Sequence, residues 1–302
     1  MNFSNLVRPH WAALRALLVL TAIVGIAYPI FIWLVAQLPG LRGNANGSII
    51  EVDGKPVGSS LIGQAFTDSD GKPLPQYFQS RPSAVGDGYD PLATSASNLG
   101  PESVVDTPGD PSKPEDDNGA KSGLLTLVCS RSAAVGELER VDGRRPFCTG
   151  DGVGAVLSVI GPRDDRGNVV HPIKVVSVNE PCETTQTPFL NTYEGVRVEC
   201  AKYGEDYSIG QIVPIRGSAP ADPAVPADAV TASGSGLDPD ISVAYAELQV
   251  NRVAKARGVT PEQVRAAVHD QEAGRTLGIF GEPRVNVLEL NLELDKKYPA
   301  KG

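Results

Sequence analysis

Residues 16–41 read ALLVLTAIVGIAYPIFIWLVAQLPGL, a run of 26 residues without Asp, Glu, Lys, Arg or His. A helix rises about 1.5 Å per residue, so residues 16–38 alone reach roughly 34 Å, enough to cross a hydrocarbon core of about 30 Å. The run exceeds the apolar region of a cleaved signal peptide, about 7–15 residues, and Val35-Ala36-Gln37 is a poor cleavage site. It is also long for a helix of a soluble core. We therefore expect residues 1–43 to form a single transmembrane anchor.

Two residues inside the span, Gly25 and Pro29, predict a kink in the anchor helix. Proline removes a backbone hydrogen bond and its ring crowds the preceding turn. The freed backbone groups cost least where a neighbouring helix compensates them. The pair therefore indicates partner helices in the bilayer.

Charge bears on which side of the membrane the remaining chain occupies. Beyond Gly43 the sequence carries 24 Lys and Arg against all 36 Asp and Glu. This acidity argues against nucleic acid as a partner and would mildly attract cations, although plain solubility is the favoured explanation. Arg8 and Arg15 precede the span while Arg42 and Lys55 follow it, so the positive-inside count is nearly balanced. We favour a cytoplasmic N-terminus with the bulk of the chain extracytoplasmic, in the cell membrane.

The cysteines support export, because they are even in number and confined to one segment, at Cys129, Cys148, Cys182 and Cys200. An even number in an exported domain predicts two disulfides. Three pairings are open, and we favour Cys129–Cys148 with Cys182–Cys200 because local pairs close short loops. A zinc site is the rival interpretation, but there is no C-x-x-C and the spacings of 19, 34 and 18 fit no usual zinc pattern. Free buried thiols are the third alternative.

Periodicity and turn residues predict an α+β fold: a single transmembrane helix, an exported mixed α/β domain and a β-rich insert that carries the disulfides. A strand is expected at 48–52, a turn-rich stretch without periodicity at 67–100, and a flexible linker at 102–123. A helix follows at 124–141. Further strands are expected in the insert, at residues 153–160, 169–178, 195–201 and 209–215.

The last third of the chain carries clear helix boundaries. Ser242 is suited to cap a helix that ends before Gly258. Residues 260–263, Thr-Pro-Glu-Gln, form a capping box that opens a second helix. Residues 285–294 are ambiguous, since their leucines alternate as in a strand while Asn286 is placed to cap a helix; we favour the helix.

Catalytic and metal-binding motifs are missing from the sequence. It contains no H-E-x-x-H, no G-x-x-x-x-G-K-[ST] and no G-x-S-x-G. The glycines at 150, 152 and 154 lack the βαβ context of a dinucleotide site, so a β-turn is the expected structure. We expect no catalytic, cofactor-binding or metal-binding residue in this chain.

Polar, turn-forming residues dominate between Gln64 and Pro101. Within this region Arg81 is flanked by aromatic and small residues, which suits either a buried ion pair or a contact with a partner. Scaffolding of the loops within one domain is the alternative interpretation. The candidate partner contacts are Gln64, Arg81, Tyr89 and Asn98.

Long ordered motifs resemble a known family. After the anchor come Asn46-Gly47-Ser48, GSSLIGQ (58–64), YFQSRPSA (77–84), GYDP (88–91), SxSNLGP (95–101), VTASGSGLDPDIS (230–242), LQVNRVAKARG (248–258) and GEPRVNVLELNLELD (281–295). Over residues 1–101 and 218–295 the chain resembles the C subunit of the bacterial potassium-transporting Kdp ATPase, KdpC. Residues 102–217 depart from the compact family pattern, which has a short, mainly helical connection there. The helix at 124–141 is expected to replace that connection, leaving 142–217 as an insert, either a spacer or a binding module.

The resemblance implies a domain plan and a role. Residues 44–101 and 218–302 would form the extracytoplasmic KdpC-like domain, with 102–123 as linker and 124–217 as helix plus β-rich insert. The family implies a non-catalytic accessory subunit of a high-affinity potassium pump. Its partners would be a channel-like potassium-translocating subunit, a P-type ATPase subunit and a very small membrane subunit. ATP and potassium would be handled by the complex, with no cofactor bound by this chain.

Two mechanisms follow from this family. In the first, the chain stabilises assembly and modulates potassium access or affinity from the extracytoplasmic side. In the second, it is a nucleotide-binding regulator that raises the ATP affinity of the catalytic subunit. The second requires a cytoplasmic domain, because an exported domain does not meet cytoplasmic ATP.

Overall fold

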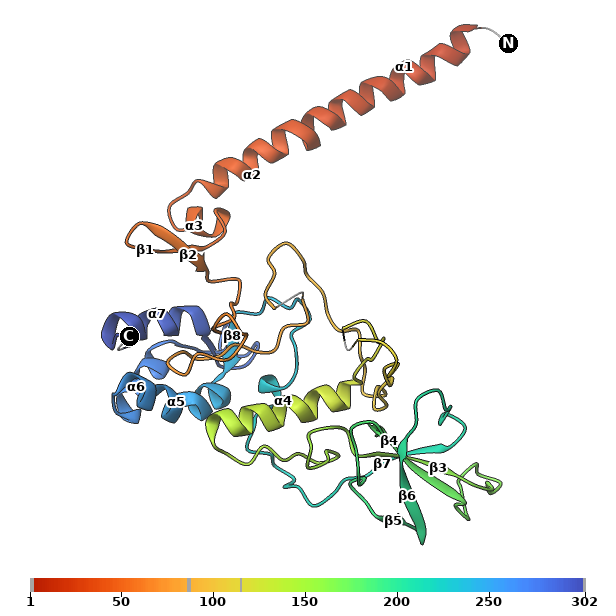
Figure 1. Ribbon diagram of the computed structural model, residues 1–302. Helices are drawn as coiled ribbons and strands as arrows, with labels where there is room; N and C mark the ends of the chain where they lie inside the picture. The colour runs from red at the N-terminus through yellow and green to blue at the C-terminus, as the bar shows by residue number, and fades with distance from the viewer. Residues whose placement is uncertain (1–2, 86–87, 115, 301–302) are drawn as a thin grey trace. The chain divides into compact units, whose positions relative to one another are not determined.

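The computed structural model describes residues 3–85, 88–114 and 116–300 (Figure 1). The chain divides into two compact units, residues 1–61 and 62–302. The division falls later than residue 43, where the sequence placed the end of the anchor. The first unit therefore contains a short hairpin in addition to the anchor helix.

The anchor is one helical stretch made of α1 (Phe3–Leu20), the π-helical η1 (Thr21–Ala27) and α2 (Tyr28–Ala36). Residues Arg8–Ala36 are long and apolar enough to cross a membrane, and none of that stretch is buried within the protein. Its 29 residues correspond to about 44 Å of helix. Among the described residues, this is the single helix that fits the span expected from the sequence.

The π-helical segment is placed directly before Pro29, which lies in the first turn of α2. The backbone N–H of Tyr28 donates to the carbonyl of Ile23, five residues back. Proline has no N–H, and a wider turn before it relieves the crowding of its ring against the preceding carbonyls. Gly25 lies inside this segment, while the bend itself stays a prediction. Pro9 inside α1 is a second proline that the sequence reasoning did not consider.

The first unit closes with α3 (Arg42–Ala45) and a hairpin of β1 (Ile49–Val52) and β2 (Lys55–Ser59). The two strands pair antiparallel, with Val52 opposite Lys55. Asp53 and Gly54 both have positive φ, 51° and 74°, which is the geometry of a two-residue type I′ turn. The strand expected at 48–52 is thus confirmed, together with a partner strand.

The core of the second unit combines helices with a small sheet. The helices are α5 (Val243–Arg257), α6 (Pro261–Asp270), α7 (Val287–Lys297) and the 3₁₀ turn η2 (Ala227–Ala229). Strands β8 (Asp240–Ser242), β9 (Glu272–Ala273) and β10 (Arg284–Asn286) form an antiparallel sheet in the order β8-β10-β9. The largest apolar side chains of this core are Phe78, Ile241, Tyr245, Leu290 and Leu294.

The predicted helix boundaries are confirmed by their caps. The side chain of Ser242 accepts from the N–H of Tyr245, and α5 ends at Gly258 with φ 68°. The capping box at the start of α6 is present, with both reciprocal bonds. Asn286 accepts from the N–H of Glu289, so the ambiguous stretch is a short strand that turns into a helix at the cap.

Helix α4 (Leu124–Glu139) packs on the same core through side chains of Val128 and Val135. The helix expected at 124–141 is confirmed, and it joins the core instead of the insert sheet. The insert sheet has the order β5-β6-β4-β3-β7. Its strands are β3 (Val156–Ile160), β4 (Lys174–Pro181), β5 (Thr192–Tyr193), β6 (Val196–Ala201) and β7 (Gln211–Pro214).

Within the insert, β4 and β6 run parallel and the other neighbours antiparallel. Of the four strands expected there, β3, β6 and β7 lie within the expected ranges, whereas β4 begins later than expected and runs on to Pro181; β5 was not expected. A separate small core holds the sheet, formed by Leu157, Val159, Val175 and Val198. The beta-rich insert therefore has its own hydrophobic centre.

Both disulfides join local pairs, as expected. Cys129–Cys148 connects α4 to the segment before β3, and Cys182–Cys200 connects the end of β4 to β6. Together these two bonds pair Cys129, Cys148, Cys182 and Cys200. The first disulfide ties the insert to the helix that belongs to the main core.

The linker at 102–123 is fastened at its ends. The carboxylate of Asp106 accepts from the N–H of Gly123 at 2.6 Å and from Thr126 Oγ1 at 2.8 Å. Asn179 of β4 accepts from the N–H of Asp106 and donates to the carbonyl of Val104, both at 2.8 Å. Burial raises the pKa of Asp106. These bonds fix the linker to α4 and β4.

Candidate functional site

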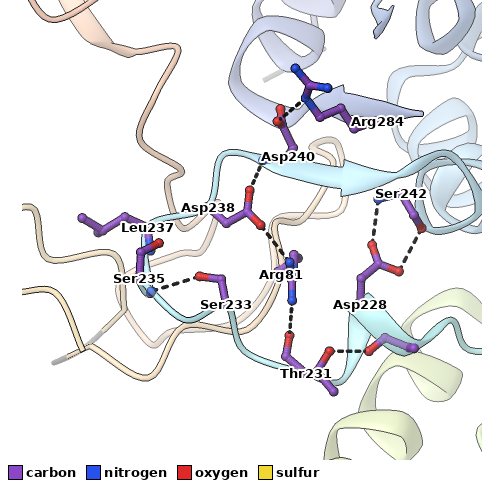
Figure 2. A network of polar contacts seen from close by, with 12 residues as sticks. Arg81, Asp228, Thr231, Ser233, Ser235, Leu237, Asp238, Asp240, Ser242 and Arg284 are labelled. Atoms are coloured by element: carbon purple, nitrogen blue, oxygen red, sulfur yellow. Dashed lines mark hydrogen bonds and ion pairs between the residues drawn. The ribbon is translucent and has the colours of Figure 1, made fainter. Parts of the chain in front are cut away.

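Arg81 makes an ion pair across the two segments that flank the insert (Figure 2). Its Nη1 donates to Asp238 Oδ2 at 2.8 Å, and its Nη2 donates to the carbonyl of Thr231 at 3.3 Å. Its Nε is buried and has no hydrogen-bond partner in the part of the chain that the structure describes. Arg81 therefore forms an ion pair with a residue 157 positions away, but the pair is partly exposed and not buried, with side chains 23% and 29% exposed.

Three aspartates organise the segment that receives Arg81 (Figure 2). Besides pairing with Arg81, Asp238 accepts the N–H of Asp240 through Oδ1 at 3.0 Å. Asp240 pairs with Arg284 of β10 at 2.8 Å. Asp228 accepts both the N–H and the hydroxyl of Ser242, at 2.7 and 2.8 Å. Because Ser242 caps α5, this network fixes the start of that helix as well as the position of Arg81.

Tyr89 lies against the same segment. Its hydroxyl donates to the carbonyl of Arg81 at 2.7 Å, and burial raises its pKa to about 12. The ring lies on Gly63, where a Cβ would approach Tyr89 Cε1 to 2.4 Å and the carbonyl of Asp238 to 2.6 Å. The second glycine of the GSSLIGQ motif is thus required by close packing.

Ser83 and Gly236 interlock the two segments further. The Ser83 hydroxyl donates to the carbonyl of Gly236 at 2.8 Å and accepts from the N–H groups of Val85 and Tyr89. Gly236 has φ 71°, and a Cβ there would come within 2.0 Å of Val85 Cγ2. Only glycine combines this left-handed backbone with so close a neighbour.

Three of the four candidate contacts, Gln64, Arg81 and Tyr89, line one cavity of about 320 Å³. The carbonyl of Gln64 accepts from the hydroxyl of Ser80 at 2.9 Å. Asn98 is not among the lining residues; it is exposed, with φ 54°. The structure therefore assembles three candidates at one place and leaves the fourth on an exposed loop.

Two buried amides that the sequence reasoning missed hold the segment around Arg81. Asn291 of α7 accepts from the N–H of Phe78 at 2.8 Å and donates to its carbonyl at 3.0 Å. Gln249 of α5 does the same for Gln79, at 2.7 and 3.1 Å. A primary amide offers a donor and an acceptor, so it satisfies buried irregular backbone as a neighbouring strand would. In the sequence, each of these amides could have been recognised as a polar residue on the otherwise apolar face of its helix.

A buried ion pair also went unpredicted. Arg252 Nε of α5 lies 2.9 Å from Glu139 Oε1 of α4, and their side chains are 8% and 1% exposed. Arg252 Nη1 also donates to the carbonyls of Pro75 and Tyr77. Burial raises the pKa of Glu139, and the charge of Arg252 opposes that shift. The pair connects α4, α5 and the loop that leads to Arg81.

Arg257 holds the same part of this loop as Arg252. Its side chain is buried and donates to the carbonyls of Gln76 and Tyr298 and to Asp295 Oδ1, at 2.8, 2.9 and 2.9 Å. The guanidinium lies 5.2 Å from the centre of the Tyr77 ring, within the range of a cation–π contact. Residues 75–77 are thus held by two arginines from α5.

The chemistry of this arrangement is structural. Carboxylates and guanidiniums pair with one another or with backbone groups, and among the described residues no group of three or more His, Cys, Asp or Glu is placed to hold a metal ion. The network joins residues 63–89 to residues 228–242 and to three helices. It presents a shaped surface with a polar cavity.

These features define a class: proteins with one candidate membrane-spanning helix near the N-terminus and a mixed α/β core built from two sequence segments that flank an insert. The family model described as K+-transporting ATPase, c chain, KdpC, matches residues 10–105 and 210–296. The chain belongs to the KdpC family.

Full-length relatives agree with this assignment. The potassium-transporting ATPase KdpC subunit of Kineococcus radiotolerans is 36% identical over 299 residues, 99% of either chain. That of Streptomyces coelicolor is 36% identical over 300 residues, 97% of this chain and 94% of the relative. That of Mycobacterium tuberculosis H37Rv is 33% identical over 284 residues, 94% of this chain and 96% of the relative.

The comparisons also place the insert. The family model leaves residues 106–209 unmatched, close to the segment 102–217 that the sequence set apart. The relatives align over nearly the whole chain, so they span this segment as well. The insert is a feature that this chain shares with them.

Proposed function

We propose that this chain is a non-catalytic accessory subunit of an ATP-driven potassium uptake pump, which stabilises assembly and modulates potassium access from the extracytoplasmic side. Membership of the KdpC family supports a place in such a complex. The expected partners are a channel-like potassium-translocating subunit, a P-type ATPase subunit and a small membrane subunit. ATP and potassium are handled by the complex.

The loop 91–99 carries the proposal. It lies within the part matched by the family model, yet nearly all of it is exposed, and Leu92 is 95% exposed. Its hydrogen bonds join near neighbours, such as the N–H of Leu92 to Asp90 Oδ1 and that of Leu99 to Ser97 Oγ. A family segment that its own fold leaves uncovered is suited to contact another subunit. We assign Leu92 and Asn98 to the contact with the potassium-translocating subunit.

Arg81 supports this proposed contact without being part of it. It positions Tyr89 through its carbonyl, and Ser83 fixes the backbone of the same tyrosine just before the loop starts. R81A keeps this carbonyl but removes the guanidinium that ties the segment to Asp238 and Thr231, so it is expected to disturb the base of the loop without removing a residue from the proposed interface. Variants of the proposed interface residues and a variant of the supporting Arg81 therefore test the two roles separately.

The experiment is co-purification of the tagged chain with the other pump subunits. L92S and N98A are expected to lower recovery of the potassium-translocating subunit while the isolated chain keeps its circular dichroism spectrum. R81A is expected to lower recovery as well, with reduced thermal stability. The matched control is I173S, which changes an apolar residue of the insert that is also largely exposed. Undiminished recovery and unchanged potassium affinity in L92S and N98A contradict the proposal.

Sidedness is the other part of the proposal, and the two disulfides support an extracytoplasmic domain because such bonds persist in oxidising compartments. A cysteine introduced at the exposed Asp117 reports on it directly, since the four native cysteines are paired. Labelling by a membrane-impermeant maleimide in intact cells is expected. Labelling only after lysis would place the domain with cytoplasmic ATP and favour the nucleotide-binding alternative.

A further inference from the structure

The connection between β9 and β10 presents three large apolar side chains to solvent. Leu277, Ile279 and Phe280 are 84%, 69% and 61% exposed. They lie in residues 276–281, which we call the apolar knob and which contain no charged residue. At its base Arg275 and Glu282 pair at 2.6 Å, so the nearest charges neutralise each other.

The knob is ordered by its own backbone. The N–H of Thr276 donates to the carbonyl of Phe280 at 2.8 Å, and the N–H of Phe280 donates back at 3.0 Å. The N–H groups of Gly278 and Ile279 donate to the carbonyls of Arg275 and Thr276. Internal satisfaction of backbone groups is what an apolar environment demands, because unpaired groups are costly there.

We propose that the apolar knob inserts into the boundary between headgroups and acyl chains of the bilayer that the chain's own helix crosses. The composition of the patch favours lipid over protein, since a protein interface also contributes hydrogen bonds. The knob exposes three large apolar side chains, and the N–H groups of Thr276, Gly278, Ile279 and Phe280 are already paired within it or with Arg275. Leucine, isoleucine and phenylalanine without nearby net charge are suited to the acyl boundary.

A weak insertion of the knob is sufficient, because the anchor helix already holds the chain at the membrane. Helix α2 ends at Ala36 and the second unit begins at Ile62, so a tether of about 25 residues, at most about 90 Å when fully extended, keeps that unit near the bilayer. Tethering replaces a bimolecular association with an intramolecular one at high effective concentration. The knob therefore acts as a second, reversible contact with the bilayer.

The test is the depth of a nitroxide placed on the knob. The full chain with I279C, labelled and reconstituted into lipid nanodiscs, is examined by electron paramagnetic resonance with oxygen and with the nickel chelate Ni-EDDA as relaxing agents. The control is L92C, on an exposed loop outside the knob. We expect collisions with Ni-EDDA to be several-fold fewer at position 279 than at position 92, and collisions with oxygen to be more frequent.

A second variant keeps the test falsifiable. L277S/F280S removes the other apolar side chains without touching the core, and the label at 279 is then expected to regain the Ni-EDDA accessibility of the control. A label that is water-accessible in the nanodisc overturns the proposal. A label at position 279 that is protected from Ni-EDDA only in the assembled pump also overturns the proposal, because that outcome means that the knob contacts another subunit. Both readings are independent of whether loop 91–99 proves to be an interface.

Discussion

Replacing Arg252 by methionine tests how the family core holds α4 and the loop before Arg81. Arg252 and Glu139 are almost fully buried, 2.9 Å apart, and Arg252 also serves two backbone carbonyls. Breaking a buried pair by removing one partner costs about 3–5 kcal/mol, because the remaining charge is left without compensation. We expect R252M to lose about that much free energy of unfolding.

The double variant E139M/R252M sharpens the prediction. It removes the stranded charge, so the loss is expected to fall to about 1–3 kcal/mol, the cost of carbonyls left without a donor. The double variant should therefore be more stable than R252M alone, with a coupling energy between the sites of at least about 1 kcal/mol. Simple addition of the two single effects would refute the reasoning.

The effect depends on pH with a definite sign. Burial raises the pKa of Glu139 and Arg252 lowers it, so R252M raises that pKa further. A carboxyl whose pKa is higher in the folded state favours folding at low pH, and this contribution is lost as pH rises through the folded-state value. The deficit of R252M should be smaller at pH 5 than at pH 8.

The assay is urea unfolding of the full chain in detergent, followed by circular dichroism at both pH values. Tryptophan fluorescence is unsuitable, since Trp11 and Trp33 both belong to the anchor. A deficit below about 1 kcal/mol at pH 8, or one that does not change with pH, contradicts the structural role assigned to the pair.

Three further changes probe the fold in urea unfolding experiments. G63A introduces a Cβ 2.4 Å from a tyrosine ring and should cost about 1–3 kcal/mol, whereas G274A, where a Cβ meets nothing within 4 Å, should cost much less; equal effects would contradict the packing argument. N291A leaves a buried N–H and carbonyl unpaired and should cost about 2–4 kcal/mol; a loss below about 1 kcal/mol would contradict it. C182S/C200S opens a loop of 18 residues and should cost about 3 kcal/mol, with the loss confined to the unfolding of the insert; a uniform loss would show that the insert and the core unfold together.

Part of the candidate site was accessible from the sequence. The density of turn-forming polar residues singled out Gln64, Arg81 and Tyr89, and the structure places all three around one cavity. Asn98 belongs to the same sequence pattern but lies apart on an exposed loop. Pattern reasoning identifies residues that share a chemical character, and it does not tell which of them meet in space.

The sequence by itself determined what depends on neighbours within a few residues. Composition defined the span, Ser242, Thr260 and Asn286 defined helix starts, and loop length favoured the local disulfides. These interactions involve residues that are close in the sequence, so they can be recognised from a short stretch of it. The strand-to-helix change at Asn286 shows the limit, because strand β10 exists only through its pairing with β8 and β9.

Tertiary structure alone decided which distant groups meet. Arg81 finds Asp238 across 157 residues, and the amides of Gln249 and Asn291 take the place of strand neighbours for backbone 170 and 213 positions away. Such pairs form only when the segments before and after the insert fold together. Burial then strengthens each polar contact and makes an unpaired polar group costly. The same arginine is an exposed charge in an open loop and a fixed support in the folded domain, and no local pattern distinguishes the two.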